Sequence, residues 1–82
     1  MTADEKTAAL AKLRAENTAA RPALLVTYLD ALITYREAQA NIDANGAIVF
    51  HPRTGAPIEN PYLAVRDRAA RVLVAAKLRS EF

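Results

Sequence analysis

One long helical pattern limits what this chain can fold into more than any other feature. The pattern runs from Pro22 to Asn45 and has a marked boundary at each end. Proline fits well in the first turn of a helix, and the glycine of Asn45-Gly46 is a common stop because glycine accepts the left-handed conformation. At about 1.5 Å per residue, the predicted helix is roughly 36 Å long. The whole chain of 82 residues is short enough that we expect one domain built along this helix.

The long helix carries apolar residues over an unusually wide arc. On a helical wheel its polar residues fall on one narrow stripe, and two neighbouring apolar faces remain. One small domain can hardly cover both faces, and without cysteine the remaining way to stabilise so small a core is oligomerisation. We therefore expect a ring-forming oligomer. The candidate oligomerisation residues are Leu25, Leu29, Ile33, Tyr28 and Tyr35, where subunit or core packing is favoured for the tyrosines over stacking on bases.

Shorter elements flank the long helix. Upstream, an alanine-rich stretch with only two leucines predicts a helix with little surface to bury, which we expect to be peripheral or partly mobile. Downstream, a β-branched and aromatic run followed by a turn with proline and glycine predicts a short hairpin. Asn60-Pro61 then combines a capping residue with a first-turn proline, which predicts another helix. The predicted fold is mainly α, in a single domain of residues 1–82: an N-terminal helix over 3–17, a long central helix over 22–45, a short β-hairpin over 47–58 and a C-terminal helix over 61–80.

The charge of the chain is nearly balanced, with 11 basic and 9 acidic side chains, so the distribution of charge is more informative than the total. The last predicted helix is locally basic. Its arginines suit either of two roles, neutralising DNA phosphates or pairing with acids such as Asp30 and Glu37 of a neighbouring chain. The candidate DNA-binding residues, including those of the first helix, are Lys6, Lys12, Arg14, Arg21, Arg66, Arg68, Arg71, Lys77 and Arg79.

Catalytic chemistry is poorly represented in the sequence. The single histidine, His51, lies in a proline-containing turn with no second histidine or cysteine to complete a metal site, so a turn role is favoured over a catalytic one. There is no glycine-rich phosphate loop and no serine elbow. We expect no catalytic residues, no metal and no cofactor, and therefore no enzyme.

The location of the protein is also indicated by what the sequence lacks. The first six residues include two acids and no apolar run, which is unlike a signal peptide. No apolar stretch approaches the roughly 20 residues that span a bilayer. We expect a soluble, cytoplasmic protein without membrane contact.

A resemblance emerges from the order of the downstream motifs. A long helix closing on Asn45-Gly46, a turn containing Gly55 and a helix opened by Asn60-Pro61 together resemble the small subunit of a tailed-phage terminase, over roughly residues 24–78. The resemblance implies a phage, a prophage or a gene transfer agent as the source. It also implies a ring that engages viral double-stranded DNA and recruits or regulates the large terminase subunit, which supplies the ATPase motor and the nuclease. Because the sequence shows no convincing helix-turn-helix, we expect the DNA contact to be weak and non-specific. The site of action would be the bacterial host cell.

Two other functions remain open from the sequence. A protein-interaction adaptor would use the same arginines in ion pairs between subunits and would have little DNA affinity of its own. A small DNA-binding regulator would require a recognition helix and a two-fold assembly, and the sequence shows no convincing helix-turn-helix.

Overall fold

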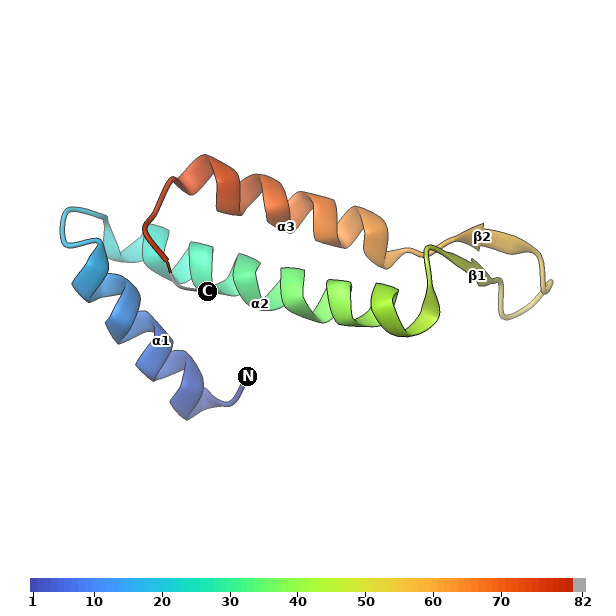
Figure 1. Cartoon of the computed structure of the whole chain (residues 1–82), viewed down its shortest axis with the longest axis horizontal. Coiled ribbons are helices and arrows are strands. Elements are labelled where there is room, and N and C mark those ends of the chain that lie inside the picture. The colour runs from blue at the N-terminus through green and yellow to red at the C-terminus, as the bar shows by residue number, and fades with distance from the viewer. Residues whose placement is uncertain (81–82) are drawn as a thin grey trace.

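Three helices and one hairpin make up the part of the chain that the computed structural model describes, residues 1–80. Along the chain these elements are α1 (Ala3–Glu16), α2 (Pro22–Asn45), β1 (Ile48–Phe50), β2 (Pro57–Glu59) and α3 (Tyr62–Ala76). Helix α2 is the axis of the molecule, with α3 antiparallel beside it, α1 packed obliquely across its first half, and the hairpin projecting beyond its far end (Figure 1). The predicted class, mainly helical with a short antiparallel hairpin before the last helix, is confirmed. None of the helices among residues 1–80 has the length and apolar character needed to cross a membrane.

Helix α1 begins and ends with side-chain caps. The Thr2 hydroxyl accepts a hydrogen bond of 3.2 Å from the Glu5 amide, which satisfies one of the free N–H groups at the helix start. At the other end the Asn17 side chain donates to the Leu13 carbonyl at 3.0 Å. Only Ala9 and Leu13 of this helix are buried, so α1 lies at the periphery and is held by a narrow apolar face.

Helix α2 has the boundaries that its sequence predicts. Pro22 opens the first turn. Gly46 ends the helix with φ of 86°, a backbone conformation that residues other than glycine adopt only with strain. The Gly46 amide still donates to the Ile42 carbonyl, at 2.7 Å. The reversal at Gly46 directs the chain into β1.

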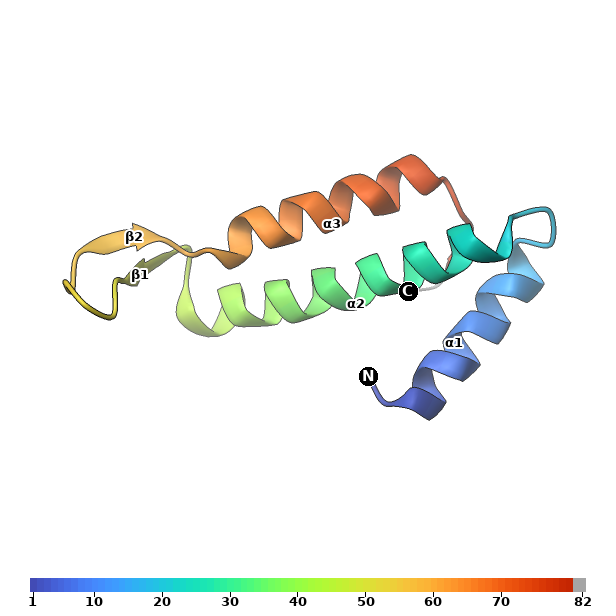
Figure 2. The same cartoon turned by 180° about the vertical axis from the view of Figure 1, so that it is seen from behind.

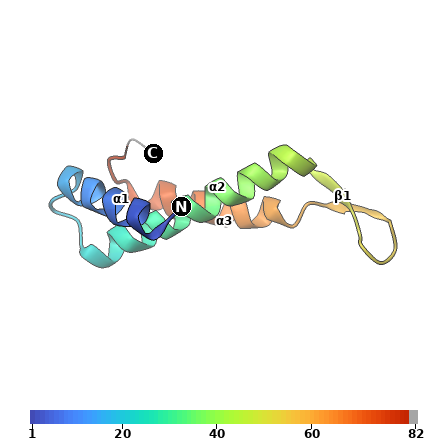
Figure 3. The same ribbon diagram turned by 90° about the horizontal axis from the view of Figure 1, so that it is seen from below.

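The two apolar faces of α2 are partly covered, each by a different helix of the same chain. Figures 1 and 2 show α1 and α3 on two sides of α2, and Figure 3 shows the same relation from below. Between α1 and α2 lies a cluster made of Ala9, Leu13, Leu25, Tyr28, Leu29 and Leu32, with Leu73, Ala76 and Leu78 packed against it. The small residues Ala38 and Ala69, 0% and 5% exposed, permit close approach of the helices. Coverage within the chain is partial, because Leu24 and Val26 on the same helix remain 37% and 46% exposed. The expectation of a partner for the rest of the arc stays a prediction.

The hairpin is a minimal antiparallel pair. Val49 faces Ile58 across the strands, Ile48 faces Glu59, and Phe50 faces Pro57. The turn is closed by the His51 amide, which donates to the Ala56 carbonyl at 2.8 Å. The strands lie within one residue of the predicted hairpin.

Helix α3 is shorter than predicted. It begins at Tyr62 and ends at Ala76, whereas the sequence predicts a helix that continues to residue 80. Lys77 takes the left-handed conformation, with φ of 51° and ψ of 37°, and this turns the chain back toward α1. The apolar side chain of Leu78 gains contact with the core by this turn, and burial of that side chain stabilises the departure from the helix.

Candidate nucleic-acid interface

The segment after α3 is tied to the corner between α1 and α2 by one asparagine. The Asn17 side chain donates to the Arg79 carbonyl at 2.8 Å, and its oxygen accepts from the Arg79 amide, also at 2.8 Å. The two bonds together satisfy the amide and the carbonyl of Arg79, which lies beyond the end of α3 and has no helical partners for them. Residues 62 positions apart in the sequence are thus held side by side.

This tie gathers basic residues from three segments at one end of the molecule. The last turn of α1, the connection to α2 and the segment after α3 all lie at the end opposite the hairpin (Figures 1 and 2). The side chains they contribute are Arg14, Arg21, Lys77 and Arg79, and all four are exposed. Glu16 is the acidic residue on these segments within residues 1–80, so the local charge is positive. We call this group of four the basic end.

The remaining candidate DNA-binding residues lie elsewhere. Lys6 forms an ion pair of 3.4 Å with Asp30. Arg66 contacts Asp67 at 3.2 Å and donates to the Gln39 side chain at 3.4 Å. Exposed pairs of this kind contribute little to stability, but they reduce the positive charge that these side chains offer to a phosphate.

Three further candidates lie on the exposed surfaces of the outer helices. Arg68 and Arg71 are exposed on α3, between the basic end and the hairpin, and Lys12 is exposed on α1. The structure therefore does not place all nine candidates on one surface. The pairing of Asp30 with Lys6 also gives this acid a partner within its own chain, where the sequence left open a partner on a neighbouring one.

The candidate oligomerisation residues fall into two groups. Leu25, Tyr28 and Leu29 are 1%, 8% and 3% exposed, because α1 and the segment after α3 cover them. Ile33 and Tyr35 are half-buried. Burial within one chain accounts for the apolar character of Leu25, Tyr28 and Leu29. A partner copy could therefore contact mainly Ile33 and Tyr35.

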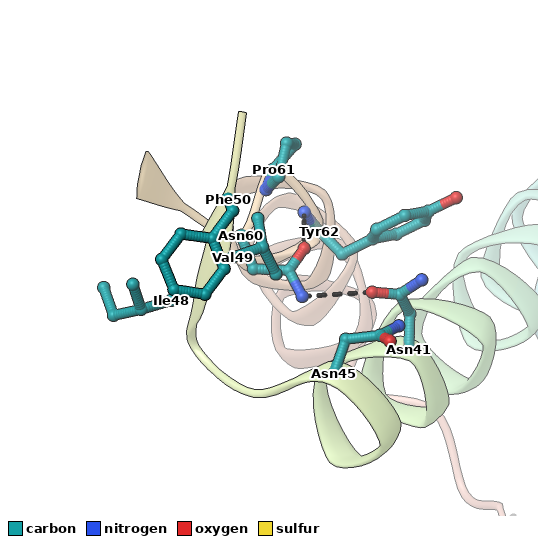
Figure 4. Close-up of a pocket in the computed structure, with 8 residues that line it drawn as sticks. All are labelled: Asn41, Asn45, Ile48, Val49, Phe50, Asn60, Pro61 and Tyr62. Carbon is teal, nitrogen blue, oxygen red and sulfur yellow. Dashed lines mark hydrogen bonds between the residues drawn. The ribbon is translucent and has the colours of Figure 1, made fainter. Parts of the chain in front are cut away.

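The hairpin end of the molecule is organised by a buried asparagine that the sequence identified only as a helix cap. Asn60 is 2% exposed, and its side chain donates to the Asn41 side chain and to the Gly46 carbonyl, both at 3.0 Å. Its oxygen accepts from the Tyr62 amide at 3.0 Å. The side chain thus satisfies the first amide of α3 from one residue before the N-cap, which is Pro61 rather than the predicted Asn60. It also binds the start of α3 to the end of α2, beside a hollow of about 460 Å³ whose lining side chains Figure 4 shows.

His51 has a local structural role. Its Nδ1 accepts a hydrogen bond of 3.1 Å from the Arg53 amide inside the hairpin turn. Within residues 1–80 no group of three or more histidine, cysteine, aspartate or glutamate residues is arranged to hold a metal ion.

The described part of the chain is an elongated, mainly helical body with a basic end and an exposed hairpin at the opposite end, which defines a class of small helical proteins. The family described as phage terminase, small subunit, matches residues 5–82, and the chain belongs to this family. Searches of curated proteins and of solved structures found no match.

Membership confirms the resemblance seen in the sequence and has direct consequences for function. Small terminase subunits are non-catalytic, so the protein is not an enzyme. The family implies a role in phage DNA packaging, with the large terminase subunit and DNA as partners.

Proposed function

We propose that the protein assembles into a ring of identical copies, engages double-stranded DNA through its basic end, and recruits or regulates the large terminase subunit, the ATPase and nuclease of packaging. The observation that carries the DNA part is the tie between Asn17 and Arg79, which holds the Arg79 backbone against the connection between α1 and α2. Arg14 and Arg21 lie at the two ends of that connection. Arginine and lysine bind DNA without sequence preference by displacing counterions from the phosphates.

Assembly would allow the few positive charges of the basic end to bind DNA effectively. One copy presents four exposed cations at the basic end, which predicts weak, non-specific affinity and strong dependence on salt. Copies in a ring present the same four side chains repeatedly to one duplex, and each additional contact forms at a high effective concentration. The proposal therefore links DNA affinity to the multimeric state.

The DNA contact is tested by reversing one exposed charge at the basic end and one outside it. Arg21→Glu and Arg71→Glu change the net charge equally, and both side chains are exposed. We expect Arg21→Glu to weaken binding to a short duplex and to lower the slope of log affinity against log salt by about 1 for each copy engaged. Arg71→Glu should retain most of the affinity, as measured by fluorescence anisotropy across a salt series.

Light scattering on the same samples supplies the control for assembly. Both variants should keep the mass of the unaltered multimer, so that a change in affinity reflects the contact itself. Equal losses in the two variants would contradict a DNA surface at the basic end. A multimer that does not bind the duplex at low salt would favour the adaptor function. A monomer or simple dimer by light scattering would contradict the ring.

A further inference from the structure

The hairpin carries an exposed apolar face. Ile48 and Phe50 are 57% and 72% exposed. Directly opposed residues of an antiparallel pair point to the same side, so the strand register places Pro57 and Glu59 on that face with them. A two-stranded hairpin by itself is at best marginally stable in water, and so large an exposed aromatic surface is better explained by a partner. We call this set of four residues the hairpin face.

A complementary apolar hollow lies on the flank of the same chain. It sits between α2 and α3 and has a volume of about 320 Å³. Its walls come from Ala31 and Thr34 of α2 and from Val65, Arg68, Ala69 and Val72 of α3. Most of this lining is small or aliphatic, so the hollow can receive an apolar side chain while its one charged wall residue stays at the rim. We call it the flank groove.

The hairpin face cannot occupy the flank groove of its own chain. The hairpin projects past the ends of α2 and α3, while the groove lies along these helices, and all three views agree on this separation (Figures 1, 2 and 3). The molecule extends over 50 Å along its longest axis. Contact between the two surfaces therefore requires a second copy.

Charge complementarity favours a second copy over an unrelated partner. Glu59 on the hairpin face and Arg68 at the flank groove are both exposed, and neither forms an ion pair within the described part of the chain. The hairpin face, which is apolar and carries an acid, is thus complementary to the flank groove, which is apolar and carries an arginine. The two surfaces carry opposite charges, and every copy of the chain has both of them.

We propose that the hairpin face of one copy inserts Ile48 and Phe50 into the flank groove of the next copy, with Glu59 beside the partner's Arg68. The inference rests on the proposed self-assembly and specifies its contact. Because the two surfaces are different, the contact is head-to-tail, and repetition of a head-to-tail contact gives a closed ring when the rotation between copies closes. Every copy would then use one face and one groove.

Engineered cysteines test this contact directly, since the chain has no cysteine of its own. The double variant Pro57→Cys with Val72→Cys places one thiol on the hairpin face and one in the flank groove, and it leaves Phe50 intact. The matched control is Pro57→Cys with Val74→Cys. Val74 lies two residues further along α3 and is 76% exposed against 36% for Val72, so simple accessibility favours the control.

With a short bis-maleimide crosslinker, we expect the Val72 pair to give a ladder of covalent multimers and the control pair to give little beyond background. A ladder that is equal or stronger for the Val74 pair would overturn the head-to-tail contact. A multimer seen by light scattering but crosslinked by neither pair would overturn the contact and leave the ring proposal standing. A monomer by light scattering would reject both proposals together.

A charge exchange gives a second, independent readout. Glu59→Arg and Arg68→Glu should each lose the multimer when purified alone, because each then sets like charges against each other at every contact. Both changes in one chain, Glu59→Arg with Arg68→Glu, should restore the mass of the unaltered multimer, because every contact then sets opposite charges against each other again, whatever the number of copies. Failure of the double variant to assemble, with all three variants folded by circular dichroism, would overturn the pairing of Glu59 with Arg68.

Discussion

Leu25→Ala is expected to lower the free energy of unfolding by about 2–5 kcal/mol, the usual cost of removing a large side chain from a closed core. Leu25 is 1% exposed and belongs to the same cluster as Leu13, which is 0% exposed. A chain of this length has a total stability of roughly 4–12 kcal/mol, so the substitution removes a large share of it. Urea unfolding followed by circular dichroism measures the change.

The neighbouring residue provides the control. Leu24 has the same side chain but is 37% exposed, so Leu24→Ala should cost about 1 kcal/mol or less. Equal costs for the two substitutions would contradict the packing of α1 on α2. If Leu25→Ala instead reduced the mass of the multimer and left the unfolding curve unchanged, Leu25 would lie between copies, as the sequence alone suggests.

Asn60→Asp is expected to lower the free energy of unfolding by about 2–4 kcal/mol, because it turns two donated hydrogen bonds into contacts between acceptors. The Asn60 amide group donates to the Asn41 side chain and to the Gly46 carbonyl. A carboxylate has no proton to donate to either, and at 2% exposure the site offers little water to replace them. The start of α3 should separate from the end of α2, and thermal unfolding should show a lowered midpoint.

The same chemical change at the other end of the bond is the matched control. Asn41 contributes its oxygen to the bond with Asn60, and Asn41→Asp keeps an oxygen acceptor at that place. We expect Asn41→Asp to change stability by less than about 1 kcal/mol. A large loss in both variants would show that charge near the hairpin, rather than the missing donor, is responsible.

The sequence predicted those element boundaries that depend on the conformational preferences of a single residue. Pro22 and Gly46 bound α2 because one lacks an amide proton and the other accepts a positive φ, and both properties belong to the residue itself. The end of α3 was not predictable in this way. Lys77 has no intrinsic preference for the left-handed conformation, and only the contacts of Leu78 and Arg79 with the rest of the chain explain it.

The candidate site was predictable in its residue types but not in its arrangement. The basic residues are visible in the sequence, yet a helical wheel cannot show that Lys6 and Arg66 have acidic neighbours. Nor can it show that the backbone of Arg79 is bonded to Asn17, in the connection between Arg14 and Arg21. Asn17 gave no signal, since an asparagine after a helix is ordinary and its partner lies 62 residues away. The role of Asn60 in joining α2 to α3 was hidden for the same reason.

The residues alone are enough to predict a protein that is helical around one long axis, carries a hairpin before its last helix, and belongs among the phage terminase small subunits. Local residue properties and short-range motifs are sufficient for these conclusions. Which apolar residues are buried, and which charges lie near one another, depends on how the helices pack. Helical periodicity shows that a residue lies on an apolar face, but whether α1, α3 or another copy covers that face depends on contacts between residues far apart in the chain.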